Sequence, residues 1–171
     1  SVTWQIPEIC LQQGVTHAVL SPGSRCAPLT LAFSRHPKIH CLTVADERAA
    51  AYMALGMAQQ LKRTVVLICT SGTAALNFCP AIAEAFYLHV PLMVLTADRP
   101  PEWIDQRDGQ AIHQRNLYGP HVKKSAEWPV DLTHPDARWL GERLLSQLLI
   151  LSGRKPLGPV HLNIPLREPL Y

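Results

Sequence analysis

Short apolar runs alternate along this chain with stretches in which apolar residues recur every three or four positions. The run at residues 64–69 (TVVLIC) has no polar interruption, which is typical of a strand covered on both faces of a sheet. We predict strands at residues 17–21, 40–44, 64–69, 91–97, 122–128 and 159–164, and helices at residues 28–33, 45–61, 72–87 and 135–151. This alternation predicts an α/β fold, with a doubly wound, mainly parallel sheet and helices on both of its faces.

Details of the pattern predict how these elements pack. We expect an exposed strand at 122–128, a last strand at 159–164 that closes the sheet, and a kink at Pro80. Residues 99–119 are predicted to form a long loop, and a loop of this length in a compact domain is more often functional than not. Two apolar helix stripes are expected to face the core: Ala50, Met53, Ala54, Met57, Ala58 and Leu61 in the first, and Leu140, Leu144, Leu148 and Leu151 in the second.

The composition narrows the class of protein. With 171 residues, 47% of them hydrophobic and 17% charged, residues 1–171 fit one globular domain. A net charge of +3, with no run of more than two Lys or Arg residues, argues against nucleic acid as a partner and suits small anionic ligands. The five cysteines form no CxxC pair, so we expect neither a disulfide framework nor a metal site but a reducing, cytoplasmic location. No apolar run is long enough to span a membrane.

Polar clusters follow four of the predicted strands. They are Ser21–Arg25, Asp46–Arg48, Thr70–Thr73 and Asp98–Glu102. Because ligands of open α/β sheets bind beyond the carboxyl ends of the strands, we expect these clusters to share one ligand-binding edge. The chain contains neither a GxGxxG motif nor a GxxxxGK[ST] motif, so no dinucleotide fingerprint or P-loop supports nucleotide binding there.

Glu47, at the start of the 45–61 helix, is compatible with two roles. The default interpretation is that its carboxylate only interacts favourably with the positive end of the helix dipole. Alternatively, it points into an apolar, partly dry site, where burial raises its proton affinity for use in catalysis.

Other candidates also have two interpretations, ligand binding and local structure, and the structural one is favoured for Gly72, Thr73, Arg99 and Gln110. Ser24 and Arg25 suit a carboxylate or phosphate site or a structural turn, and Gly72 and Thr73 suit an anion cradle or a helix cap. Arg99 suits an anion or local pairing with Asp98 or Glu102, of which local pairing is favoured, and Gln110 suits a ligand contact or an exposed loop position. The residues His17, His40, His161, Cys69 and Cys79 are interpreted as structural.

Taken together, the motifs resemble one family of enzymes. SPGSR, DER, TSGTA, LTADRPPE, QAIHQRNLYG and the closing GPVHLNIPLREPLY, in this order from Ser21 to Tyr171, are similar to the MenD family. Its members are the thiamine-diphosphate-dependent 2-succinyl-5-enolpyruvyl-6-hydroxy-3-cyclohexene-1-carboxylate (SEPHCHC) synthases of menaquinone biosynthesis. The resemblance covers only the family's N-terminal, pyrimidine-binding domain. It implies that a central domain and a diphosphate-binding domain, the latter with Mg²⁺, are absent from this chain.

The resemblance also implies roles for individual residues. Glu47 matches the glutamate that hydrogen-bonds the aminopyrimidine of the cofactor and so promotes formation of the thiazolium ylid. This ylid decarboxylates 2-oxoglutarate, and the product carbanion adds to isochorismate. Arg25 and Arg99 match arginines that bind the substrate carboxylates, with Ser24 and Gln110 lining the same pocket. The cofactor-binding residues expected in this chain are Glu47, Gly72, Thr73 and Gln110, and no metal ligand is expected.

Two departures and two rival interpretations accompany the resemblance. Cys26-Ala27 and Gly109 stand where the family often has Ser-Thr and Asn, so we expect altered fine contacts to substrate. A decarboxylase of the acetolactate synthase group and a non-catalytic, anion-binding α/β module are the alternatives. Because sites of this type are completed across a homo-oligomer interface, in a dimer or a tetramer, the isolated chain is expected to be inactive.

Overall fold

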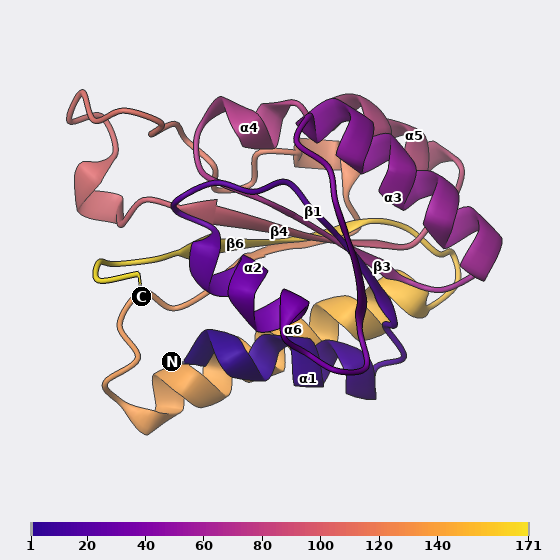
Figure 1. The fold of residues 1–171 in the computed structure, drawn as a ribbon, viewed down its shortest axis with the longest axis horizontal. Coiled ribbons are helices and arrows are strands. Elements are labelled where there is room, and N and C mark those ends of the chain that lie inside the picture. Colours follow the sequence, from indigo (N-terminus) through magenta and orange to yellow (C-terminus); the bar gives the residue numbers. More distant parts are fainter. Residues whose placement is uncertain (1, 171) are drawn as a thin grey trace.

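The computed structural model describes residues 2–170, which form a layered domain around a six-stranded sheet (Figure 1). All neighbouring strands are parallel. Their order across the sheet is β2 (His40–Thr43), β1 (His17–Leu20), β3 (Val65–Cys69), β4 (Leu92–Asp98), β6 (Val160–Pro165) and β5 (Ser125–Glu127). This arrangement confirms the predicted fold class. The expectation that the last strand closes the sheet is wrong, because β6 lies between β4 and β5 and leaves β5 at the edge.

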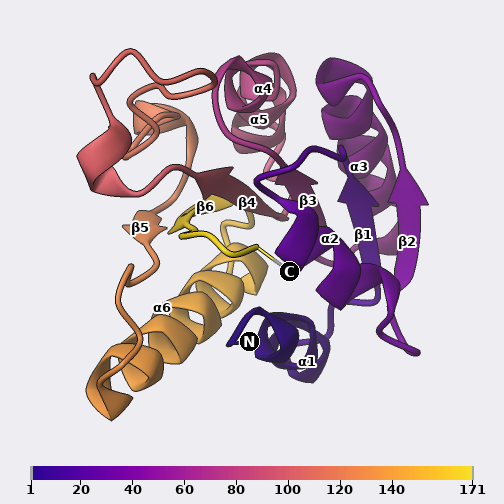
Figure 2. The ribbon, with the colours of Figure 1, turned by 60° about the vertical axis from the view of Figure 1, so that its left-hand side comes forward.

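Helices cover both faces of the sheet, as Figure 2 shows. One layer contains α1 (Ile6–Gln12), α2 (Ala27–Ser34) and α6 (Pro135–Gly153), with the short helix η1 (Val2–Gln5) before α1. The other layer contains α3 (Glu47–Leu61), α4 (Thr73–Leu76) and α5 (Cys79–Tyr87). The long loop after β4 carries only two 3₁₀ turns, η2 (Pro101–Trp103) and η3 (Gly119–His121).

Each helical layer makes its own hydrophobic core with the sheet. Phe33 of α2 and Leu145 of α6 belong to one core, and Ala54 of α3 and Ile82 of α5 belong to the other. The strands β3, β4 and β6 are buried along their whole length because both of their faces are covered, which explains their continuous apolar pattern. None of the helices in residues 2–170 combines the length and hydrophobicity that a bilayer crossing needs. All five cysteines are free thiols.

The predicted core stripe of α3 is partly wrong. Its buried face consists of Ala50, Ala51, Ala54, Leu55 and Ala58, whereas Met53 and Leu61 are exposed and Met57 is half-buried. The alanines let α3 pack closely on β3 and β1, while the face that carries the methionines lies near the edge strand β2. There Met53, Met57 and Leu61 line an open apolar groove with Leu42.

The predicted core stripe of α6 is also partly wrong, although Leu148 is buried as predicted and Leu151 packs against the core. The buried residues of α6 are Gly141, Leu145, Leu148, Leu149 and Ser152, whereas Leu140 is exposed and Leu144 and Leu151 are half-buried. Gly141 allows α6 to approach Trp128 closely, because a Cβ at this position would lie 2.9 Å from the indole ring. Trp128 is itself buried, and β5 is half-buried, so the predicted exposed strand at 122–128 is wrong.

The segment 72–87 forms two helices and not one kinked helix. The helix α4 ends at Leu76, and α5 begins at Cys79 with Pro80 in its first turn. Proline is well tolerated there because the first N–H groups of a helix have no partner within the helix.

Cys69 is buried as predicted, whereas Cys79 is only half-buried.

Candidate functional site

The candidate site lies where the strand order reverses. The chain leaves β1 for β2 on one side and later reaches β3 on the other side, so a crevice is expected beyond the carboxyl ends of β1 and β3. The turns that follow these two strands touch each other. A Cβ on Gly23 would lie 2.5 Å from the Cβ of Thr70, so only glycine allows this approach. The two turns therefore share one edge of the sheet, as predicted.

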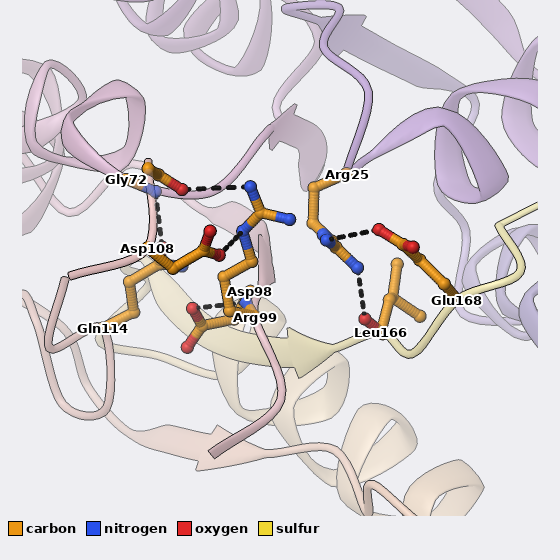
Figure 3. Close-up of polar contacts among 9 residues, drawn as sticks. Arg25, Gly72, Asp98, Arg99, Asp108, Gln114, Leu166 and Glu168 are labelled. Carbon is orange, nitrogen blue, oxygen red and sulfur yellow. Dashed lines mark hydrogen bonds and ion pairs between the residues drawn. The ribbon is translucent and has the colours of Figure 1, made fainter. Parts of the chain in front are cut away.

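Arg25 is fixed in this edge by the C-terminal segment. Its Nη1 donates to the carbonyl oxygen of Leu166 at 2.9 Å, and its Nη2 donates to Oε1 of Glu168 at 3.1 Å (Figure 3). The guanidinium is almost fully buried. Its Nε is buried without a hydrogen-bond partner among residues 2–170, which is costly for a charged group.

Arg99, directly after β4, is paired within the loop that follows. Its Nε lies 3.1 Å from Oδ2 of Asp108, and its Nη2 donates to the carbonyl oxygen of Gly109 at 3.0 Å (Figure 3). Local pairing was predicted, but the expected partners are wrong. Asp98 accepts the backbone N–H of Arg99 at 2.8 Å, and Glu102 pairs with Arg167. The loop folds back after η2, which brings Asp108 beside an arginine nine positions earlier in the chain.

One cavity brings the two arginines together. It has a volume of about 330 Å³ and is lined by Arg25, Arg99, Pro100, Trp103, Asp108, Arg167 and Glu168. Three guanidinium groups face two carboxylates there, so the cavity has an excess of positive charge and suits an anion. Trp103, Asp108, Arg167 and Glu168 were not predicted as site residues from the sequence. Arg167 could have been found by applying the strand-end rule to β6, because it follows the carboxyl end of that strand.

Other predicted residues lie outside this cavity. Ser24, Thr73 and Gln110 are exposed, and Glu47 is half-buried. Gly72 is buried, and the N–H that was considered for anion binding instead donates to Oε1 of Gln114 at 2.8 Å. Gly72 is the N-cap residue of α4, which has only four residues and no side-chain cap, so the turn caps this helix through its backbone and the anion cradle is not supported.

Gln114 connects three parts of the edge and was not singled out from the sequence. Its Nε2 donates to the carbonyl oxygen of Ala97 at 3.0 Å and to Oδ1 of Asn163 at 3.1 Å, while its Oε1 accepts from Gly72. The side chain is buried. Nothing in the local sequence distinguishes it from the exposed Gln110, because both are loop glutamines.

A second buried network supports the ends of β4 and β6. Burial raises the pKa of Asp98 to about 6, although hydrogen bonds from Asn163 and from the backbone of Arg99 act in the opposite direction. Thr96 Oγ1 donates to Oδ1 of Asn163 at 2.8 Å and lies 2.8 Å from Nε2 of His161. Burial lowers the pKa of His161 to about 3, so the ring is neutral at physiological pH and has the structural role predicted for it.

Glu47 begins α3 but does not cap it. The carboxylate of Asp46 accepts the N–H of Ala49 at 2.7 Å and thereby satisfies the helix terminus. Glu47 is therefore not needed to cap α3. Burial, followed by the charges of Cys26 and Glu47, raises the pKa of the Cys69 thiol.

The hydroxyl oxygens of Thr70 and Ser71, directly after β3, are buried without hydrogen-bond partners among residues 2–170. These two hydroxyls are unsatisfied hydrogen-bonding groups at the carboxyl end of β3, and the half-buried Glu47 follows the carboxyl end of β2 on the same edge of the sheet. Such a donor and acceptor set fits a polar heterocycle such as an aminopyrimidine. Within the described residues, no group of three or more His, Cys, Asp or Glu side chains is arranged to hold a metal ion.

Comparison with known proteins places these features in a family. The family model "Thiamine pyrophosphate enzyme, N-terminal TPP binding domain" matches residues 2–117. The chain belongs to this family. The matched segment includes Glu47, Gly72 and Arg99, whereas Arg167 and Glu168 lie beyond it.

Relatives of this TPP-binding domain carry the name that the motifs indicated. A SEPHCHC synthase of Cytophaga hutchinsonii is 55% identical over 168 residues, which cover 98% of this chain and 30% of that protein. A SEPHCHC synthase of Geobacillus thermodenitrificans is 49% identical over 94% of this chain and 27% of that protein. The resemblance to the MenD family is confirmed, and the chain spans less than a third of the length of these curated relatives.

A solved structure confirms the fold of the TPP-binding domain. The thiamine diphosphate-dependent 4-hydroxybenzoylformate decarboxylase of Rhodococcus jostii RHA1 superimposes with a TM-score of 0.82 at 21% identity, over 96% of this chain and 30% of that chain. At this level of identity the match supports the sheet architecture alone. Tyr171, the last residue of the closing motif, lies outside the described residues.

Proposed function

We propose that this chain is the N-terminal, pyrimidine-binding domain of a cytoplasmic SEPHCHC synthase that joins 2-oxoglutarate to isochorismate. The observation that carries the proposal is the cavity at the carboxyl edge of the sheet into which both Arg25 and Arg99 open. Both substrates are carboxylates, and guanidinium groups bind carboxylates with charge-assisted, often bidentate hydrogen bonds. The high identity to proteins named SEPHCHC synthase supports this substrate class over pyruvate alone.

The proposed substrate contacts come from the loops that bound the cavity. Arg25 and Arg99 hold the carboxylates, since both are already oriented by backbone carbonyls of the chain. Ser24 and Gln110, which are exposed at the same edge, contribute further hydrogen bonds once a substrate or a neighbouring domain covers them. Gly109 provides a main-chain carbonyl to Arg99, a contact that does not depend on the side chain at this position.

Thiamine diphosphate is the proposed cofactor, and the residues present fit it. When bound, it supplies the chemistry of decarboxylating a 2-oxo acid and of forming a carbon–carbon bond. Glu47 holds a proton at the ring nitrogen of the aminopyrimidine, a task for which a half-buried carboxylate is suited. The turn at Gly72 and Thr73 and the backbone of Gln110 form the wall beside the ring. The diphosphate and Mg²⁺ are proposed to bind a different domain.

The proposed holoenzyme is a dimer or tetramer of a longer polypeptide with central and diphosphate-binding domains. The relatives are more than three times as long as this chain, which supports further domains. Because the cofactor would be held between the pyrimidine-binding domain of one subunit and the diphosphate-binding domain of another, residues 1–171 alone are expected to turn over no substrate.

An assay of the complete polypeptide with three substrate sets tests the proposal. We expect SEPHCHC from 2-oxoglutarate with isochorismate, and neither acetolactate from pyruvate nor product from isochorismate alone. Acetolactate formation as the main activity would favour a decarboxylase of the acetolactate synthase group. If the reading frame instead stops after codon 171, or if purified residues 1–171 form SEPHCHC unaided, the proposed domain organisation is wrong.

A further inference from the structure

Arg25 and Glu168 form an ion pair, but their side chains differ strongly in burial. The side chain of Arg25 is 5% exposed, and a hydrogen bond to the Leu166 carbonyl fixes its orientation. The side chain of Glu168 is 72% exposed, and its carboxylate lies in the same cavity. The guanidinium is therefore a fixed part of the cavity wall, whereas the carboxylate can leave it for water at little cost, as exposed ion-pair partners generally can.

The contact also leaves Arg25 incompletely satisfied. Glu168 accepts one hydrogen bond, from Nη2, while Nε remains buried without a partner among the described residues. Nε and Nη2 form one edge of the guanidinium, which matches the two oxygens of a carboxylate. A ligand carboxylate that bridges both atoms would satisfy the arginine better than Glu168 does.

The other acidic residue of the cavity is less exposed than Glu168. The Asp108 side chain is 31% exposed and forms an ion pair with Arg99 Nε at 3.1 Å, although this Nε makes no hydrogen bond to a described residue. Arg99 also donates to the Gly109 carbonyl in the same loop. Arg167, the third cation of the cavity, is paired with Glu102. Of the two carboxylates that line the cavity, Glu168 is thus the one that an incoming anion can replace.

We propose that Glu168 is an internal competitor whose carboxylate occupies the Arg25 position that a ligand carboxylate takes, so that Glu168 sets the carboxylate affinity of the cavity. The proposal rests on the proposed function, because it assumes that Arg25 binds carboxylates. The proposal adds that a ligand binds by replacing the Glu168 carboxylate at Arg25. The ligand carboxylate takes Nη2 and Nε of Arg25, and the Glu168 carboxylate is released into solvent.

Titration of residues 1–171 with succinate tests the exchange, with the Nε–Hε resonances of the arginines followed by NMR. Glu168→Gln keeps the size of the side chain and removes its charge. We expect this variant to bind succinate roughly threefold to tenfold more tightly than the wild-type chain, since the competing ion pair is gone. The gain should disappear in the double variant with Arg25→Lys, which lacks the guanidinium edge.

Asp105→Asn is the matched control. Asp105 is an exposed loop carboxylate that contacts His113 and does not line the cavity, so its removal changes the net charge equally without freeing Arg25. An equal gain in Asp105→Asn would overturn the proposal, because a long-range charge effect would then explain the result. Unchanged, weaker or unmeasurable binding in Glu168→Gln would also overturn it.

The Arg99→Lys and Arg25→Lys single variants separate this outcome from failure of the proposed function. If both bind succinate as the wild-type chain does, the carboxylate site lies elsewhere and the proposed function loses its support. If they lose binding while Glu168→Gln gains none, the arginine site stands and only the exchange is wrong. Should Arg25→Lys fail to fold, the comparison of Glu168→Gln with Asp105→Asn decides alone, since both positions are exposed.

Discussion

The backbone N–H of Gly72 donates to Oε1 of Gln114 at 2.8 Å, which ties the turn after β3 to the long loop after β4. The same glutamine holds the Ala97 carbonyl at the end of β4 and the Asn163 side chain of β6. One buried amide therefore fixes the separation of three strand ends. The proposed cofactor and substrate contacts of Gln110 and Arg99 depend on this loop being placed correctly.

Gln114→Ala is expected to lower the free energy of unfolding by roughly 2–4 kcal/mol, because it leaves buried donors and acceptors without partners. Urea denaturation of residues 1–171 measures the change. Gln106→Ala is the control, since Gln106 is an exposed glutamine of the same loop and should change stability by less than about 0.5 kcal/mol. Equal losses in the two variants would show that the network contributes nothing specific.

Gly72→Ala is expected to be strongly destabilising, by roughly 2–4 kcal/mol. Gly72 has φ +87°, and a Cβ there would lie 2.9 Å from the Cα of Gln110. Gly56 in α3 provides the contrast, because a Cβ at Gly56 meets nothing within 4 Å. Gly56→Ala should stabilise the chain by up to about 1 kcal/mol through helix propensity. Thermal unfolding of both variants checks the pair, and a tolerated Gly72→Ala would contradict the close packing of the loop.

Asp98 should make stability fall as pH rises from about 4 to about 6. Its folded pKa of about 6 exceeds the ordinary 3.8, so the folded chain holds this proton more tightly than the unfolded chain does. The stabilising contribution is complete below pH 3.8 and is lost as pH passes through about 6, in total on the order of 3 kcal/mol. The measurement is the free energy of unfolding of wild type minus that of Asp98→Asn at several pH values.

Subtracting the free energy of unfolding of Asp98→Asn from that of wild type also removes the effect of His161, which changes stability with pH in the opposite direction. The pKa of His161 is lowered to about 3, so its contribution is lost as pH falls below 6.5 in both proteins and cancels in the subtraction. A difference between wild type and Asp98→Asn that stays constant from pH 4 to pH 7 would contradict the raised pKa of Asp98.

Glu47→Gln in the complete polypeptide should slow SEPHCHC formation at least about 100-fold, the scale of a lost proton-transfer group. Hydrogen–deuterium exchange at the C2 atom of the bound cofactor should slow in parallel. Asp46→Asn is the control, because it removes the neighbouring charge while asparagine still caps α3. Near-normal exchange in Glu47→Gln, with intact folding, would remove this residue from the proposed chemistry.

The sequence predicted the strands well for a physical reason. Strands buried on both faces, such as Val65–Cys69, must be apolar throughout, and that signal is local. Helix faces were less predictable. A period of 3.6 residues leaves neighbouring stripes nearly equivalent, and the choice of Ala51 and Leu55 over Met53 and Leu61 depends on where α3 sits above the sheet.

The site was predictable in its residue types but not in its pairings. The strand-end rule brought Arg25 and Arg99 to one edge, and the structure places them in one cavity. Their partners Glu168 and Asp108 depend on the path of long connections, and Glu168 is 143 positions away from Arg25. No local pattern encodes a contact over such a distance.

The anchoring of Arg25 by Leu166 and Glu168 has a practical consequence for anyone who trims this polypeptide. A version cut after β6, at Pro165, keeps every strand of the described sheet, yet it deprives a buried cation near the amino end of both of its acceptors. The residues that follow the final strand act as a strap across the first loop. Domain boundaries drawn from secondary structure alone would sever it.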